Sequence, residues 1–409
     1  METYTESIAR YEYFKRQGLD INMERGWPCK RQLDLSMPML DTVTSRTDLV
    51  QEVDYRGYDG TGGIMPLKRL FADILNVMEE EIYIGGTMST TLMFDIVNKA
   101  FLWGFEGNRP WKTCEKVKFI CPSPGYEKHF KICTAFGIEM IPVTMDEYGP
   151  DMDAIEKLAV SDDTIKGIWC VPLYSNPTGA IYSDEVVFRL ASMKTAAEDF
   201  RLFWDNAYCV HHLTETKYKI RNIIRECEKA GNPDRVFEFA STSKITFPGG
   251  GVAVCASSIR NIQWMTKNSL LQLKSGDKIN QLRHVLFLRD REGLDEHMAR
   301  HRSIIAEKFD IVDSVLKEEL EGTDIVKWEK PKGGYFFNVK TKPHLAKAVC
   351  EKCIEAGVRI TPAGSTFPYG NDPEDAYLRL APTFPDNDEL EKAMRVFCLS
   401  AKIAAGTGG

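Results

Sequence analysis

Long apolar runs are missing from this 409-residue sequence. A helix that spans a membrane needs about 18 or more consecutive apolar residues, and no stretch of the sequence reaches that length. The first residues read METYTESIARYEYFKRQ and contain no apolar core of the kind found in signal peptides. The sequence therefore predicts a cytoplasmic protein that has no membrane partner.

Other absences exclude further classes. The net charge is −7 and no basic cluster occurs, so we expect no nucleic-acid partner. No phosphate-binding Walker loop or dinucleotide fingerprint is present. The eleven cysteines are odd in number and follow no disulfide spacing, which indicates reduced thiols. Cys350 and Cys353 lack a second cysteine pair and His297 and His301 lack a third ligand, so no metal site is predicted.

Short apolar runs alternate with helical patterns over most of the chain. Seven runs are interpreted as strands: Ile82–Ile84, Lys118–Cys121, Ile138–Val143, Ile165–Val171, Leu202–Trp204, Val236–Ala240 and Gly250–Ala256. This alternation is typical of an α/β fold whose mostly parallel sheet is covered by helices on both faces. We expect a large domain with a seven-stranded sheet at 46–283, and a smaller α+β domain at 284–409 that packs with an N-terminal arm at 1–45.

The run Ser241-Thr242-Ser243-Lys244 follows one of these strands and precedes a glycine-rich stretch. A lysine becomes a nucleophile when burial or a neighbouring cation lowers its pKa. Ser241 and Ser243 provide hydroxyl groups, and Gly85–Ser89 provides backbone N–H groups at the start of a helix, which together suit a phosphate. The alternatives are a surface lysine and an ordinary helix cap.

Asp205 ends another apolar strand, where a carboxylate is costly to bury unless it meets a cation. A protonated pyridine nitrogen is such a cation, and protonation makes its ring an electron sink. Tyr208 and Asn176 could contact the hydroxyl group of such a ring, and Tyr126 could stack on its face. We therefore interpret Lys244 as the amine that holds pyridoxal phosphate. Taken singly, these motifs could also be a helix cap, turn residues and a core tyrosine.

Arg379 is a guanidinium within the apolar run Leu378-Arg379-Leu380. Its planar fork is suited to a carboxylate that accepts two hydrogen bonds. That carboxylate could belong to a substrate, or to an Asp or Glu of the same chain in a structural ion pair.

These motifs together resemble the pyridoxal phosphate-dependent aminotransferases of fold type I (class I/II), and most closely a bacterial aspartate aminotransferase branch. The resemblance extends over nearly the whole chain, in the blocks PGYEKHF, GPDMD, IKGIWCVPLYSNPTG, DFRLFWDNAYCVHHL, STSKITF, INQLRH, GGYFF, FPYGNDPED and LRLAPTFP.

The resemblance implies roles for individual residues. Lys244 would be the Schiff-base lysine and proton shuttle, and Asp205 would hold the pyridine nitrogen. The other implied cofactor contacts are Asn176 and Tyr208 at the ring hydroxyl, Tyr126 at the ring face, and Met88, Ser89, Ser241 and Ser243 at the phosphate. The implied substrate contacts are Arg379, the backbone of Gly26, Asn176 and Lys128. Tyr58 would reach the phosphate of a neighbouring subunit, so the resemblance implies a homodimer with shared active sites.

Two positions depart from the family pattern. Many relatives have an arginine against the phosphate where this chain has Val252, and we expect Lys278 or Arg283 of a partner chain to supply the missing cation. Lys128 stands where this branch is expected to have an arginine. It would bind the substrate's side-chain carboxylate as a point charge rather than as a fork.

The implied reaction transfers the amino group of an L-amino acid, with aspartate as the leading donor, to 2-oxoglutarate. The alternatives are an aminotransferase with broader or aromatic donors, or a β-lyase on the same fold. A domain that senses pyridoxal phosphate without turnover is the alternative outside enzymes. It would need a DNA-binding partner segment, and residues 1–45 are too short to provide one.

Overall fold

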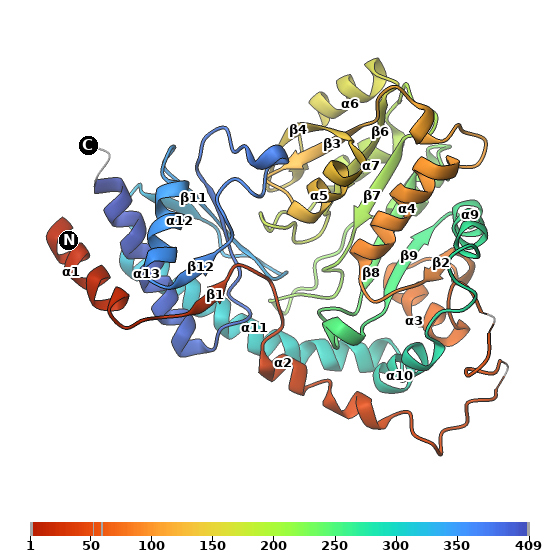
Figure 1. Cartoon of the computed structure of the whole chain (residues 1–409), viewed down its shortest axis with the longest axis horizontal. Coiled ribbons are helices and arrows are strands. Elements are labelled where there is room, and N and C mark those ends of the chain that lie inside the picture. The colour runs from red at the N-terminus through yellow and green to blue at the C-terminus, as the bar shows by residue number, and fades with distance from the viewer. Residues whose placement is uncertain (1–2, 52, 59, 407–409) are drawn as a thin grey trace.

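The computed structural model describes residues 3–51, 53–58 and 60–406 of the chain. They form two lobes that lie side by side, with both chain ends on the smaller one (Figure 1). The larger lobe contains a sheet with the strand order β2-β9-β8-β7-β6-β3-β4-β5. Its strands are β2 (Ile82–Ile84), β3 (Lys118–Ser123), β4 (Glu139–Asp146), β5 (Gly149–Pro150), β6 (Ile165–Cys170), β7 (Arg201–Asp205), β8 (Val236–Ser241) and β9 (Ala253–Ser257).

The sheet is mostly parallel, as predicted. The strands β4, β3, β6, β7 and β8 pair in parallel with one another in that order, whereas β9 is antiparallel to both β8 and β2, and β5 is antiparallel to β4. All seven predicted strands are present. The sheet has eight strands rather than seven because β5 pairs with the end of β4 through only two residues, which is too short a run to be recognised in the sequence.

Helices cover both faces of this sheet. Leu202 and Trp204 belong to one core cluster, and Phe203 between them belongs to the cluster on the opposite face. Successive side chains of a strand point to opposite faces, so this alternation requires apolar cover on both. The covering helices are α3 (Met65–Leu75), α4 (Ser89–Trp103), α5 (Glu127–Phe136), α6 (Met152–Ser161), α7 (Asp184–Ser192), α8 (Ile223–Lys229), α9 (Ile259–Ser269) and α10 (Lys278–Leu288).

The smaller lobe contains an antiparallel sheet of β10 (Val326–Trp328), β11 (Phe337–Thr341) and β13 (Tyr377–Leu380). A second sheet pairs β1 (Ile21–Met23) with β12 (Val358–Ile360) in parallel. Its helices are α1 (Tyr4–Lys15), α11 (Arg291–Leu320), α12 (Ala346–Glu355) and α13 (Asn387–Gly406). The short helices of the whole chain are α2 (Lys30–Asp34), η1 (Met37–Asp41), η2 (Glu79–Glu81), η3 (Trp111–Thr113), η4 (Pro248–Gly250) and η5 (Pro368–Gly370).

The 30-residue helix α11 connects the two lobes. Leu294 and Met298 near its start pack in the core of the large lobe, whereas Ile305 and Phe309 pack in the core of the small lobe. The predicted domain boundary between residues 283 and 284 lies inside α10, just before this connection.

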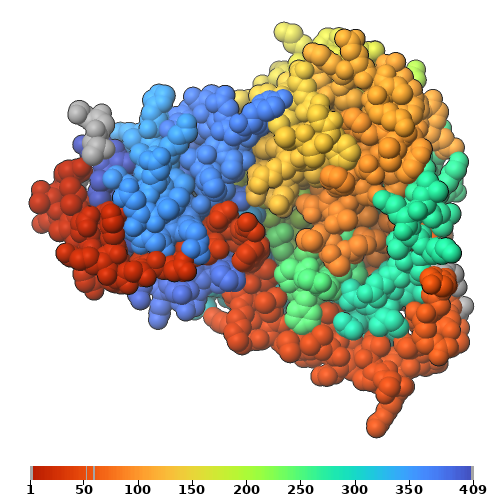
Figure 2. Space-filling view, in the orientation of Figure 1, coloured from red at the N-terminus to blue at the C-terminus, as the bar shows by residue number. Residues whose placement is uncertain are grey.

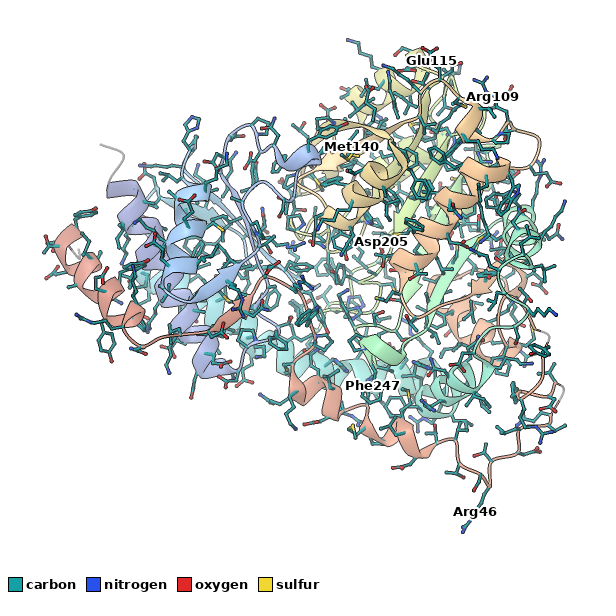
Figure 3. The ribbon with its side chains drawn as sticks, in the orientation of Figure 1. Arg46, Arg109, Glu115, Met140, Asp205 and Phe247 are labelled. Atoms are coloured by element: carbon teal, nitrogen blue, oxygen red, sulfur yellow. The ribbon has the colours of Figure 1, made fainter. Side chains whose placement is uncertain are left out.

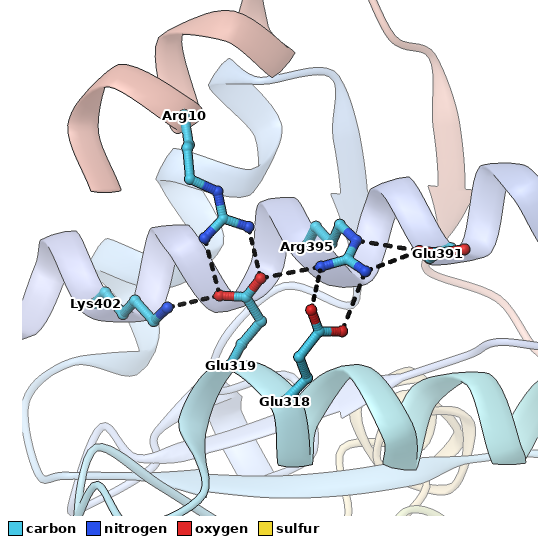
Figure 4. A network of polar contacts seen from close by, with 6 residues as sticks. All are labelled: Arg10, Glu318, Glu319, Glu391, Arg395 and Lys402. Carbon is cyan, nitrogen blue, oxygen red and sulfur yellow. Dashed lines mark hydrogen bonds and ion pairs between the residues drawn. The ribbon is translucent and has the colours of Figure 1, made fainter. Parts of the chain in front are cut away.

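The N-terminal arm is fixed to the small lobe at its start. Glu319 of α11 accepts hydrogen bonds from Arg10 of α1 and from Arg395 and Lys402 of α13 (Figure 4). From there the arm runs over the small lobe and into the junction between the lobes, as the red surface in Figure 2 shows. No helix among the described residues combines the length and apolar character that a membrane crossing requires.

Candidate active site

A cavity of about 450 Å³ lies at the junction of the two lobes. The parallel strands of the large lobe end at the same edge of the sheet, which is where ligands bind in open α/β sheets. All predicted site residues except Tyr58 line this cavity. They are Gly26, Met88, Ser89, Tyr126, Lys128, Asn176, Asp205, Tyr208, Ser241, Ser243, Lys244 and Arg379.

Lys244 lies in the turn after β8, and its side chain faces the cavity. Its backbone carbonyl accepts a hydrogen bond from the Tyr335 hydroxyl at 3.2 Å and lies 3.3 Å from His211 Nε2. The Lys244 ammonium lies 5.3 Å from the ring centroid of Tyr208. Burial lowers the pKa of this ammonium, the nearby Asp205 carboxylate opposes that shift, and Arg379 adds to it. The amine is therefore more easily deprotonated than an ordinary lysine.

Asp205 ends β7 on the side of the large lobe that faces the small lobe (Figure 3). Its Oδ2 lies 3.0 Å from His129 Nε2, and the His129 ring stacks on Trp169 at 4.4 Å between ring centroids. Its Oδ1 is buried and has no hydrogen-bond partner among the described residues. Because a buried carboxylate oxygen without a partner is costly, this atom marks the position of a cationic or N–H group that the site is built to receive.

Hydroxyl and N–H groups gather at the start of α4. The Ser241 hydroxyl donates to Ser243 Oγ at 3.2 Å, and the Ser243 hydroxyl donates to the Thr87 carbonyl at 3.1 Å. Met88 is the N-cap of α4, and its side chain makes no capping hydrogen bond. The first backbone N–H groups of a helix are donors without partners inside the helix. The end of β8 and the start of α4 therefore form a cradle that suits an anion.

Arg379 on β13 reaches the cavity from the small lobe. Its Nη1 and Nη2 donate to the two carboxylate oxygens of Glu127, at 2.6 and 3.2 Å. Its Nη1 also donates to Asn176 Oδ1 at 3.1 Å. Arg379 thus pairs with a glutamate of its own chain, which was the alternative considered for it. The two oxygens of Glu127 occupy the positions at this guanidinium where the carboxylate of a substrate is expected to bind.

The arm reaches this guanidinium through Gly26. A Cβ atom at this position would lie 2.7 Å from the Phe336 ring, and the Phe336 ring in turn lies 4.5 Å from the guanidinium carbon of Arg379. Only glycine allows the arm to approach so closely. Asn176, Tyr126 and Tyr208 complete the wall, and burial raises the pKa of both phenols, so these tyrosines stay protonated.

Three other residues considered for the phosphate lie outside the cavity. Tyr58 is 80% exposed on the surface of the large lobe. The Lys278 ammonium donates to the carbonyls of Asp54 and Tyr58, at 3.0 and 3.5 Å. Arg283 has a buried Nε without an acceptor among the described residues. Val252 is buried in the core of the large lobe, so this position contributes no cation.

Several residues in and behind the cavity wall were missed in the sequence. His129 holds Asp205, and Glu127 and Lys131 line the cavity on either side of Lys128 along α5. The spacing of Tyr126 and His129, one helical turn apart in the block PGYEKHF, was the available signal for the histidine. Nothing local indicated the partner of Glu127, because Arg379 is 252 positions away in the sequence.

The residues present fit pyridoxal phosphate. The open Asp205 Oδ1 suits a protonated ring nitrogen, the cradle at α4 suits a phosphate, and Lys244 lines the same cavity. An α/β sheet that presents a partly buried lysine in this setting is typical of the aminotransferases.

Comparison with known proteins gives the family. The chain belongs to the aspartate amino-transferase family, whose model matches residues 1–407. An aspartate aminotransferase of Corynebacterium glutamicum is 40% identical over 406 residues, which cover 98% of this chain and 94% of that protein. A protein of Mycolicibacterium smegmatis named as an aminotransferase is 44% identical over 399 residues, which cover 97% and 93%.

A solved structure shows the same architecture. The crystal structure of an aspartate transaminase from Corynebacterium glutamicum superposes with a TM-score of 0.96 at 39% identity, and the match covers 99% of this chain and 96% of that one. The chain is therefore an aminotransferase, and aminotransferases of this fold depend on pyridoxal phosphate.

Proposed function

We propose that the protein transfers the amino group of L-aspartate to 2-oxoglutarate, using pyridoxal phosphate. The observation that carries the proposal is the Arg379 guanidinium, which grips a carboxylate in the same cavity that holds the Lys244 amine. An amino acid whose α-carboxylate takes that position would bring its α-carbon into this cavity with Lys244. The choice of aspartate is supported by the 40% identical relative of that name.

The cofactor, when bound, supplies an electron sink for the negative charge that develops at the substrate's α-carbon. Lys244, whose pKa is lowered by burial, accepts the α-proton and returns it. Asp205 holds the ring nitrogen, and Asn176 and Tyr208 hold the ring hydroxyl. Tyr126 covers the ring face, and the phosphate contacts are Met88, Ser89, Ser241 and Ser243.

Substrate selection depends on groups at the other end of the cavity. Arg379 and the backbone of Gly26 receive the α-carboxylate. Lys128 is exposed at the rim and attracts the side-chain carboxylate of aspartate. A lysine binds a carboxylate as a point charge and imposes less geometry than an arginine. Trp27 also lines the cavity, and its ring favours broader or aromatic donors as the second candidate.

A homodimer would complete the phosphate site. Exposed apolar side chains lie on two segments that touch through the Thr61–Lys274 hydrogen bond, one of which runs from the end of the arm into the large lobe. They are Met37, Leu40, Val50, Val53, Tyr58, Leu270, Leu271 and Leu273. Apolar surface of this kind is typical of interfaces between subunits. Lys278 steadies the Tyr58 backbone, and Tyr58 with Arg283 or Lys278 would reach the phosphate of a second copy.

Two broader features belong to the same proposal. The large domain would span residues 46–283, and the arm at 1–45 and residues 284–409 would form the small domain. All eleven cysteines are free thiols, which supports a cytoplasmic location, where thiols stay reduced.

The test supplies pyridoxal phosphate, L-aspartate and 2-oxoglutarate to the purified protein and measures glutamate formation. Lys244→Ala should lower kcat by roughly 10²- to 10⁴-fold, the usual contribution of a positioned acid–base group. Lys157→Ala, at an exposed lysine of α6, is the matched control and should leave kcat unchanged.

Other substrates test the alternatives. Faster turnover of phenylalanine than of aspartate would favour the second candidate. Ammonia and pyruvate from cysteine, without glutamate from aspartate, would replace the proposal by a β-lyase. Full transamination by Lys244→Ala would contradict the role of this lysine.

A further inference from the structure

The Arg379 guanidinium has no N–H bond left for a substrate. A guanidinium offers five N–H donors, and each of the five has an acceptor here. Nε donates to Thr361 Oγ1 at 3.1 Å, Nη1 to Glu127 and Asn176, and Nη2 to Glu127 and the Glu24 carbonyl. An incoming carboxylate must therefore displace one of these partners.

Glu127 differs from the other partners in charge and shape. It is the only carboxylate among them, and its two oxygens face the two terminal nitrogens of the fork, as an α-carboxylate would. Asn176 and Thr361 are neutral, and Glu24 contributes only its backbone carbonyl. Exchange of one carboxylate for another keeps the buried guanidinium paired, whereas loss of charge pairing would be costly.

The position of Glu127 allows such an exchange. It is the first residue of α5, and its side chain lines the cavity with 21% of its surface exposed. Lys131 lies one helical turn further along α5 and lines the same cavity. Residues four apart face each other on a helix, so a released Glu127 has a cation within reach.

We propose that Glu127 is an exchangeable occupant of the substrate's carboxylate site, which an incoming carboxylate displaces from Arg379. The inference rests on the proposed function, in which Arg379 binds the α-carboxylate. Glu127 then acts as a specificity residue. A ligand with a carboxylate can take over both hydrogen bonds, whereas an amine without one leaves Glu127 in place and finds the site closed.

The occupant also sets the affinity. A ligand that binds only the open form has an apparent Kd equal to its intrinsic Kd divided by the open fraction. Weakening the ion pair between Glu127 and Arg379 should therefore tighten the binding of any carboxylate that binds to Arg379.

The test measures binding and not turnover. Succinate, a dicarboxylate without an amino group, is titrated calorimetrically into the cofactor-loaded wild-type protein and into Glu127→Gln. The amide has the same shape as the glutamate but lacks its charge, and charge-assisted hydrogen bonds are roughly twice as strong as neutral ones. We expect the Kd for succinate to fall at least about tenfold, which corresponds to about 1.4 kcal/mol.

Glu24→Gln is the matched control. It removes one negative charge from the same cavity, and its carboxylate pairs with Arg25 rather than with Arg379. A Kd change much smaller than that of Glu127→Gln supports direct occupancy. Equal changes in the two variants would overturn the proposal, because they would show only a general effect of charge.

Succinate binding to a second variant, Glu127→Asp, tests the same proposal. Its carboxylate is one methylene shorter and reaches both nitrogens less well, so succinate affinity should lie between wild type and Glu127→Gln. No tightening in either variant, or no succinate binding at all, would overturn the proposal. Because succinate is not an amino donor, these outcomes are separate from whether aspartate is transaminated, which the glutamate assay decides on its own.

Discussion

The two ends of the cavity differ in how their charged groups are satisfied. At the cofactor end, Asp205 Oδ1 is buried without a partner in the part of the chain that the structure describes, and the start of α4 presents backbone donors. At the substrate end, every N–H of Arg379 is already bonded within the chain. One end is incomplete without its ligand, and the other is complete without it.

The difference matches the residence of the two ligands. A cofactor stays bound through many turnovers, so its site is rarely empty and can carry a buried acid with one oxygen that lacks a partner among the described residues. A substrate leaves after every turnover, so a buried guanidinium in its site needs a partner in the empty state. At the cofactor end, the unsatisfied Asp205 oxygen therefore lowers the stability of the cofactor-free protein. At the substrate end, the need to displace Glu127 lowers the affinity for the substrate.

The largest expected effect is the loss of cofactor affinity when Asp205 is replaced. In Asp205→Asn the amide can still accept the hydrogen bond from His129, but it cannot pair with a charged ring nitrogen. Breaking a buried charge pair costs about 3–5 kcal/mol, so affinity for pyridoxal phosphate should fall roughly 10²- to 10⁴-fold. Titration of the cofactor-free protein with pyridoxal phosphate, followed by absorbance, measures this loss.

The same variant should have the opposite effect without cofactor. The melting temperature of cofactor-free Asp205→Asn should equal or exceed that of wild type, because the substitution removes a buried charge whose Oδ1 has no partner among the described residues. Asp199→Asn is the control, since Asp199 accepts hydrogen bonds from Trp111 and Lys166 at 2.7 Å. It should lower the melting temperature with or without cofactor. A cofactor-free Asp205→Asn that melts as early as Asp199→Asn would contradict the comparison.

Much of the cofactor end could be predicted from the sequence. Lys244 and Asp205 follow strongly apolar strands, and parallel strands bring their carboxyl ends to one edge. Local pattern was therefore enough to place both residues in one cavity.

The substrate end was harder to predict because its contacts are not local. Arg379 was recognised as a carboxylate binder, but the choice between a substrate and a residue of the chain depends on how the two lobes pack. Glu127 and Arg379 lie on different lobes, on α5 and β13. The strands β1 and β5 were missed because Ile-Asn-Met and Gly-Pro are not continuous apolar runs, unlike the equally short β2, and are too short to show an alternating pattern.

The second prediction concerns Glu238, a buried carboxyl near the cofactor end whose charge should destabilise the fold. Glu238 is buried on β8 and its carboxyl accepts a hydrogen bond from Asn206, the neighbour of Asp205, at 2.8 Å. Burial raises the pKa of this carboxyl to about 7, although the bond from Asn206 opposes the shift. The folded protein then binds more protons than the unfolded chain between about pH 4.5 and 7, so stability should fall as pH rises through this window.

Glu238→Gln removes that dependence. At pH 8 the variant should be more stable than wild type by on the order of 3 kcal/mol, and at pH 4.5 the two should be similar. Urea unfolding at both pH values measures the difference. Glu115→Gln, at an exposed residue on the far side of the large lobe (Figure 3), should change stability by less than about 0.5 kcal/mol. A Glu238→Gln variant that is less stable than wild type at pH 8 would show that the buried acid is favourable.

The smallest expected effect comes from Glu319, whose ion pairs hold the arm that reaches the substrate end of the cavity. Burial alone would raise the pKa of Glu319, but hydrogen bonds from Arg10 and Lys402 lower it to about 2. A carboxyl with a depressed folded pKa contributes stability above about pH 4.5 that is lost as pH falls toward 2. Glu319→Gln should therefore destabilise the protein at pH 7 by about 2 kcal/mol, less than the full shift because the partner Arg10 is partly exposed.

The network that this change weakens holds the arm that carries Gly26 to Arg379 (Figure 4). Loosening the arm should raise the KM for aspartate a few fold, whereas the Kd for pyridoxal phosphate should stay constant because the proposed cofactor contacts lie on the large lobe. Steady-state kinetics and cofactor titration of one preparation measure both values. Weaker cofactor binding in Glu319→Gln would mean that the two ends of the cavity are not independent, since the arm would then support the cofactor end as well.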